Sequence, residues 1–325
     1  MEKAIRVEDL TQEEREAYFR PFSKDISHQS LPDKFTFPFY YEPHPLTEIA
    51  TRELQEVIRD SDESVYDFGL ENHGSGMGKM FGVLVVRKAD GEIGYLAAFS
   101  GKIGERSHFK PFVPPVYNRL TDEGFYLEGE AILNSINAEI SNLQRSNEYA
   151  KRVADVNTSK QELEAFKAES KSRLNAAKKQ RDATRKEAST TLSPSAYAAL
   201  EEELAHESIA RQLKVKHTTA ALRQKLNEAT ERLRLLTDQI DRLKEARKKK
   251  SASLQRALHE SYRFRNANQE TKDVARIFQE FSGIQPPAGA GECAAPKLLN
   301  FAYICGWKPL CMAEFWYGKS PSGEV

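Results

Sequence analysis

Residues 222–243 read LRQKLNEATERLRLLTDQIDRL, and apolar residues recur through them at alternating intervals of four and three. The residues that make up this repeat are Leu222, Leu226, Ala229, Leu233, Leu236, Ile240 and Leu243. This heptad spacing places one apolar stripe along a helix, and such a stripe is buried when a second helix packs against it in a coiled coil. The stretch therefore predicts a long helix that has a helical partner.

The partner helix is expected earlier in the same segment. Residues 130–265 contain no glycine and a single proline, Pro194, and a similar apolar seam starts at Leu133, Ile136, Ile140 and Leu143. Ser193 followed by Pro194 is typical of an N-cap with proline at the first helical position. We therefore predict two helices of roughly 60 residues each, joined by a turn at residues 190–194. So short a connection makes the two helices antiparallel.

The segment before this hairpin is rich in aromatic residues and prolines. Residues 80–86 and 93–99 are apolar runs on either side of an Asp90-Gly91 turn, which predicts a β-hairpin. Because both runs are almost continuously apolar, the sheet should be covered on both faces. Residues 45–60 have apolar residues at helical spacing and predict a covering helix.

The segment after the hairpin supplies further elements for a sheet. A helical face is expected around residues 274–281, a helix at 293–305 that ends at Gly306, and a strand at 310–317. Neither flanking segment completes a sheet by itself. We therefore predict an α/β fold, in which one mixed-sheet domain with packed helices is split by a long antiparallel coiled-coil hairpin. The expected ranges are residues 1–128, 129–265 and 266–325.

Composition excludes some classes of protein. The 325 residues include 48 basic and 48 acidic side chains, so global charge gives no argument for nucleic acid or membrane. No apolar run approaches the roughly 18 residues of a membrane span, and residues 1–11 lack the apolar core of a secretory signal. The three cysteines are too few for a disulfide framework. We expect a cytoplasmic protein without a membrane partner or a cofactor.

Local charge in the hairpin is more informative. Basic residues crowd both predicted helices, and a basic helical face can neutralise the phosphates of a nucleic acid. The candidate RNA-binding residues are Lys178, Lys179, Arg181, Arg242, Lys244, Arg247, Lys248, Lys249 and Lys250. The alternative interpretation is the solvated exterior of a coiled coil.

A second candidate site is the loop of residues 286–293, which leads directly into a predicted helix. Its candidate residues are Gly289, Gly291, Glu292 and Cys293. A helix N-terminus presents free N–H groups and a partial positive charge, which anions favour. The alternative is a tightly packed turn whose glycines are needed for positive φ angles.

No catalytic or metal motif emerges from residue spacing. Cys293, Cys305 and Cys311 lack the short spacing of zinc ligands, so we expect no metal site and interpret them as inert thiols. The sequence contains no H-E-x-x-H motif, and residue spacing does not identify a Ser-His-Asp triad. We therefore assign no catalytic residue.

Five segments together resemble the long N-terminal region of a subgroup of RluA-type RNA pseudouridine synthases, and the resemblance spans nearly the whole chain. They are residues 35–46 (FTFPFYYEPHPL), 78–85 (GKMFGVLV), 94–102 (GYLAAFSGK), 111–117 (PFVPPVY) and 286–299 (PPAGAGECAAPKLL). The resemblance implies a role beside RNA modification, with rRNA or tRNA as the partner.

The resemblance does not carry the reaction onto this chain. Those enzymes have a catalytic domain with an H-R-L-D segment, and the sequence contains no such segment. The implied function is thus that of an RNA-associated accessory region of a pseudouridine synthase, without a complete active site. One alternative is a degenerate deaminase-like fold, in which Ala295 follows Cys293-Ala294 where a catalytic glutamate belongs. Another is a structural interaction protein that forms homo-oligomers through the coiled coil.

Overall fold

The computed structural model describes residues 5–35, 42–60, 68, 76–104, 106–119 and 124–320. Residues 36–41, which belong to the first segment of the resemblance, lie outside the described residues. The chain forms two compact units: residues 1–131 together with 250–325, and residues 132–249. The second unit thus ends before residue 265, the limit expected from the sequence, because the chain re-enters the first unit at Lys250.

The first unit is built on a four-stranded sheet with the order β1-β3-β2-β6. Its strands are β1 (Arg20–Pro21), β2 (Lys79–Arg87), β3 (Ile93–Phe99) and β6 (Lys308–Tyr317). The predicted hairpin around Asp90-Gly91 is confirmed, and Gly91 has the positive φ of 92° that favours glycine in this turn.

Strand β6 pairs with β2 from Tyr317 opposite Lys79 to Lys308 opposite Arg87. Two stretches that lie more than 200 residues apart therefore complete one sheet, as the sequence predicted. Every pairing among the described strands of this sheet is antiparallel, whereas we had expected a mixed sheet. Strands β2 and β3 are antiparallel because a tight turn joins them, and β6 also runs antiparallel to β2.

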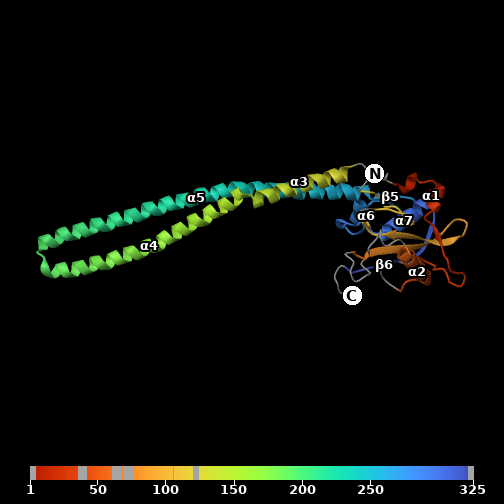
Figure 1. Ribbon diagram of the computed structural model, residues 1–325, viewed down its shortest axis with the longest axis horizontal. Coiled ribbons are helices and arrows are strands. Elements are labelled where there is room, and N and C mark those ends of the chain that lie inside the picture. Colours follow the sequence, from red (N-terminus) through yellow and green to blue (C-terminus); the bar gives the residue numbers. More distant parts are fainter. Residues whose placement is uncertain are drawn as a thin grey trace. The chain divides into compact units, whose positions relative to one another are not determined.

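The sheet is covered by one helix on each face (Figure 1). Helix α2 (Pro45–Asp60) packs its apolar stripe against one face, and α7 (Ala294–Cys305) covers the other. Alternation along the strands divides the core. Phe81, Val83, Val85, Tyr95, Ala97 and Phe99 belong to the cluster that includes α2 residues, and Leu84, Val86, Leu96 and Ala98 to the cluster that includes α7 residues. The predicted coverage of both faces is therefore confirmed.

Short elements complete this unit. They are η1 (Val7–Asp9), α1 (Gln12–Glu16), β4 (Arg263–Arg265), β5 (Thr271–Asp273) and α6 (Val274–Phe281). Thr11 and Glu14 form a reciprocal capping box at the start of α1. Strands β4 and β5 pair with each other, and three-residue strands of this kind are too short for periodicity to predict.

The hairpin consists of α3 (Phe125–Arg145), α4 (Asn147–Thr191) and α5 (Pro194–Ser261). The turn at residues 192–193 and the helix start at Pro194 are as predicted. The first arm is not the single helix that we expected. It is interrupted at Ser146, whose hydroxyl accepts from the Tyr149 backbone N–H at 3.1 Å and donates to the Leu143 carbonyl at 2.7 Å. Ser146 therefore acts as an N-cap inside the arm.

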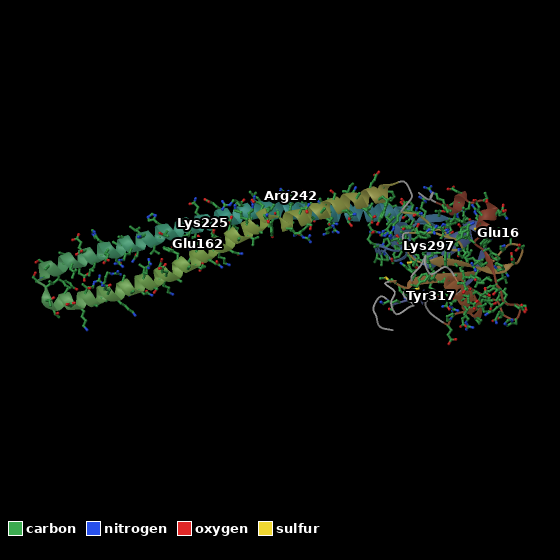
Figure 2. All side chains as sticks on the ribbon, viewed as in Figure 1. Glu16, Glu162, Lys225, Arg242, Lys297 and Tyr317 are labelled. Atoms are coloured by element: carbon green, nitrogen blue, oxygen red, sulfur yellow. The ribbon has the colours of Figure 1, made fainter. Side chains whose placement is uncertain are left out.

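Within residues 132–249, α4 and α5 run antiparallel (Figure 1). All seven residues of the predicted α5 seam are buried or half-buried, so the seam is confirmed. Glu162 of α4 and Lys225 of α5 form an ion pair at 2.6 Å (Figure 2). No described helix combines the length and the apolar character that crossing a membrane requires.

Candidate functional site

The most basic stretch of α5 runs from Arg242 to Lys250 and contains six basic residues and one acidic residue, Glu245. All six basic side chains are exposed, and Figure 2 marks Arg242 among them. Lys244 pairs with Asp241 at 3.1 Å, and Lys249 lies 4.0 Å from Glu245. Surface pairs of this kind contribute little and leave most of the positive charge uncompensated.

Two of these cations occupy positions that continue the apolar seam. After Leu243, the alternating spacing of four and three leads to Arg247 and Lys250, and then to Leu254. Leu254 is buried, whereas Arg247 and Lys250 are exposed. The apolar repeat is thus interrupted by two exposed charges at positions where the heptad pattern expects apolar residues. This interruption distinguishes residues 247–250 from the ordinary charged exterior of the hairpin.

The candidate residues on α4 form a smaller group. Lys178 and Lys179 are exposed, whereas Arg181 is half-buried. The Nη1 atom of Arg181 is buried and has no hydrogen-bond partner among the described residues. These three residues are remote in sequence from the 242–250 stretch, and no contact between the two groups is found among the described residues. We therefore treat residues 242–250 as the principal candidate interface.

The loop before α7 is tied to distant parts of the sheet domain. Glu292 accepts the Tyr262 hydroxyl at 3.0 Å and pairs with Arg119 Nη1 at 2.9 Å. Its backbone carbonyl accepts from the N–H of Gly101 at 3.0 Å, and the carbonyl of Ala288 accepts from Gln255 Nε2 at 3.1 Å. These four contacts fix the conformation of the loop and indicate a structural role for it.

The start of α7 offers little to an anion. The N–H of Ala294 donates to Ser100 Oγ and that of Ala295 donates to Glu314 Oε1, both at 3.1 Å. Pro296, at the third position, has no N–H. At the first three helical positions, the donors that would attract an anion are therefore already used or absent. These contacts favour the packed-turn alternative for this loop.

The glycines of the loop are needed for a different reason from the one expected. Neither Gly289 nor Gly291 is among the residues with positive φ, so the expectation of a left-handed conformation is wrong. A Cβ at Gly291 would overlap the ring of Tyr262, whereas a Cβ at Gly289 would meet nothing within 4 Å. Gly291 is therefore required for close packing, and Gly289 is not constrained in this way.

Lys297 is a buried cation that the sequence analysis did not single out. Its side chain is 3 % exposed, and Nζ donates to the carbonyl of Phe99 at 2.9 Å. Desolvation lowers the pKa of Lys297 to about 8, although Glu292 opposes this shift. Lys297 lies on the same helical face as buried Ala294, Leu298 and Phe301. A lysine on the apolar face of a predicted helix was the sequence signal that could have identified it.

Lys297, Arg119, Glu292 and Tyr262 also line a cavity of about 20 Å³, which Lys102 shares. That volume is enough for about one water molecule. A cavity of this size is far smaller than the pockets that bind small molecules. Figure 2 places Lys297 inside the sheet domain.

The thiols are poor nucleophiles at neutral pH. Cys293 is exposed, and desolvation by surrounding atoms, followed by the nearby Glu314 carboxylate, raises its pKa. Burial raises the pKa of Cys305 and of Cys311 to about 12. Among the described residues, no group of three or more His, Cys, Asp or Glu side chains is placed to hold a metal ion.

Comparison with known proteins does not identify this chain. No family model matches it, and neither the curated proteins nor the solved structures contain a match. The function proposed below therefore rests on the residues and contacts of the chain itself.

Proposed function

We propose that this chain is an RNA-associated accessory module that binds the phosphate backbone of rRNA or tRNA through its helical hairpin and acts beside uridine modification. The observation that carries the proposal is the exposed stretch from Arg242 to Lys250, with six cations and one carboxylate. A helix holds these charges at fixed spacing, so the binding surface requires no ordering of flexible chain.

The interruption of the seam supports the same proposal. The heptad repeat leads to positions 247 and 250, yet the chain has exposed cations there. Cations that replace the apolar residues of the repeat and remain exposed are available to an anionic partner. The resemblance of residues 78–85, 94–102 and 286–299 to the N-terminal region of RluA-type synthases supports RNA as that partner.

The proposal is tested with the variant R247E/K248E/K249E/K250E. Binding to rRNA and tRNA is measured by fluorescence anisotropy over a range of salt concentrations. Because each neutralised phosphate contributes about 0.7 to the salt dependence on single strands, four lost contacts reduce the slope of log K against log salt by roughly 3. We expect the affinity at low salt to fall at least about tenfold.

A matched control changes net charge equally at other exposed sites of the hairpin. The variant K151E/K160E/K171E/K216E reverses four exposed lysines outside the 242–250 stretch. It should retain most of the affinity and the slope. Equal losses of RNA affinity in both variants would show that the binding depends on net charge and not on residues 242–250. Absence of RNA binding by the wild-type chain at low salt would refute the proposal.

A second candidate function, self-association through the hairpin, is favoured by one observation. Ile209 and Leu213 are one helical turn apart on α5 and are 57 % and 47 % exposed. Light scattering on I209E/L213E separates the two functions. A dimer that dissociates in this variant would indicate an oligomerisation arm, whereas a wild-type monomer would leave RNA binding as the function of the hairpin.

A further inference from the structure

The antiparallel helices α4 and α5 enclose a gap in the seam along which they pack. The gap has a volume of about 260 Å³ and lies within residues 132–249, the second compact unit. Its lining residues are Phe166, Ser170, Arg173 and Leu174 of α4 and Arg211, Lys214, Val215 and Thr218 of α5. This volume is slightly below the roughly 300–1,000 Å³ of pockets for drug-sized ligands, so the gap suits a small ligand.

The gap follows from the residues that occupy the seam. From Leu222 towards the start of α5, the spacing of four and three leads to Thr218, Val215, Arg211, Ser208 and Leu204. Small hydroxyl residues and an exposed arginine thus stand at three of these five positions, where a coiled coil has large apolar side chains. Ser170, which lines the gap from α4, is equally small. Side chains of this size do not fill the space between two helices.

The helices pack against each other on both sides of the gap. On one side Ala177 of α4 and Leu204 of α5 are buried. On the other side Leu163 is buried, and the Glu162–Lys225 ion pair joins the two helices at 2.6 Å (Figure 2). The gap is therefore bounded along the seam. A partner helix needs a longer apolar groove with anchors over several turns, so a single small ligand is the better match.

One buried polar group lines the gap without a partner. Ser170 is 6 % exposed, and its hydroxyl forms no hydrogen bond to any other residue in the described part of the chain. A buried hydroxyl without a hydrogen bond costs free energy. A ligand oxygen in the gap would supply the missing partner.

The charged side chains of the lining are cations. Arg173, Arg211 and Lys214 are exposed, and no carboxylate is among the described residues that line the gap. Arg173 pairs with Glu169 at 2.6 Å, and Arg211 pairs with Glu207, each within its own helix. Exposed pairs of this kind contribute little to stability, so both arginines can turn to a ligand. The gap therefore attracts an anion.

Apolar side chains form the rest of the lining. Phe166, Leu174 and Val215 are half-buried and leave part of their surface exposed. A hydrocarbon chain that lies along them removes this surface from water, which an inorganic anion cannot do. Phe166 and Leu174 are eight residues apart on α4, a distance of about 12 Å along a helix. An elongated ligand matches this arrangement.

We propose that the gap binds the anion of a medium-chain fatty acid, with its carboxylate at Arg211 and Lys214 and its hydrocarbon chain between the two helices. The guanidinium group of Arg211 can donate to both carboxylate oxygens at once, and the Ser170 hydroxyl donates a further hydrogen bond. Phe166 and Val215 pack against the chain. This inference goes beyond the proposed function and does not depend on RNA binding.

The test is calorimetric titration of the full chain with octanoate, with octanol and with the shorter acids butanoate and hexanoate. Wild-type protein should bind octanoate at least about tenfold more tightly than octanol, because the alcohol lacks the charged group. Each added methylene group that is buried should tighten binding about fourfold, the equivalent of about 0.8 kcal/mol.

Three variants locate the ligand. S170L fills the gap with an apolar side chain and should abolish octanoate binding without lowering the melting temperature. R211A/K214A should weaken octanoate binding at least about tenfold and leave octanol binding unchanged. K216A/R223A is the matched control, since it removes two exposed cations of α5 that do not line the gap, and it should bind as wild type does. Circular dichroism verifies that each variant keeps its helices, and R211A/K214A decides the test if S170L does not fold.

Four results would overturn the inference. They are a wild-type chain that does not bind octanoate, a folded S170L that binds it unchanged, octanol that binds as tightly as octanoate, and equal losses in R211A/K214A and K216A/R223A. The last result would mean that the anion responds to net charge and not to the gap.

The variant R247E/K248E/K249E/K250E separates this inference from the proposed function. It should bind octanoate as wild type does, even though it loses RNA. If the wild type binds octanoate but no RNA, only the proposed function fails. If it binds RNA but no octanoate, only this inference fails.

Discussion

The ring of Tyr262 packs against the backbone of Gly291 so closely that no side chain fits between them. Tyr262 follows the last residue of α5, and Gly291 lies in the loop before α7. The Tyr262 ring is buried, and its hydroxyl donates to Glu292, the next residue after the glycine. Within the first unit, one aromatic ring therefore connects the residue that follows α5 to the loop that precedes α7.

Replacing Gly291 with alanine should lower the free energy of unfolding of the sheet domain by about 1–3 kcal/mol, because the new methyl group displaces the Tyr262 ring. Gly289→Ala is the matched control, since a methyl group there meets nothing within 4 Å. Urea denaturation followed by tryptophan fluorescence measures both. Equal free energies of unfolding for the two variants would show that the Tyr262 ring can move to accommodate a methyl group at position 291, and would contradict this prediction.

Lys297 should make stability depend on pH. Its folded-state pKa of about 8 lies below the ordinary value of 10.5, so between these values the unfolded chain retains a proton that the folded chain has released. Stability therefore rises with pH through this window, by roughly 2 kcal/mol between pH 7 and pH 9.5. Lys297→Met should remove this rise. Identical pH slopes for the variant and the wild type in urea denaturation would contradict the assignment.

Ser146 should control the stability of the first turn of α4. Ser146→Ala removes the acceptor of the Tyr149 N–H and should cost about 1 kcal/mol locally. Hydrogen exchange at Tyr149 should accelerate accordingly. Ser135→Ala serves as the comparison, because Ser135 is exposed within α3. An unchanged exchange rate at Tyr149 in the first variant would mean that the cap does not hold this turn.

The three cysteines should differ in reactivity towards a thiol reagent. Cys293 is exposed, whereas Cys311 is buried and Cys305 is half-buried. The folded chain should therefore react at one thiol, slowly at neutral pH and faster as the pH rises, because the pKa of Cys293 is raised. Cys293→Ser should abolish that reaction. Rapid labelling of more than one thiol in the folded state would refute this order of exposure.

Much of the local structure could be predicted from single segments. Helix α2, the β2–β3 hairpin, the start of α5 at Pro194 and the end of α7 at Gly306 agree with the sequence analysis. Each has a short-range cause: apolar spacing, a turn dipeptide, a helix cap, or a left-handed glycine such as Gly306, with its φ of 71°. Ser146 was missed because serine is common inside helices, and its capping role depends on backbone geometry.

The candidate sites were less predictable because they depend on distance in space. The cations from Arg242 to Lys250 are adjacent in sequence, so their charge could be read directly, but their exposure could not. Lys297, Arg119 and Glu292 meet across more than 170 residues. The gap between α4 and α5 likewise combines residues of two separate segments.

The sequence by itself determined the longer helices and strands, and it determined that a charged coiled-coil hairpin is inserted between the segments of one sheet, because periodicity, caps and turn residues act within a few positions along the chain. Only the tertiary structure decided that the sheet is antiparallel, that Gly291 serves close packing, and that Ser170 and Arg211 line the same gap. These features depend on contacts between distant residues, and such contacts form only when burial of the core brings the segments together.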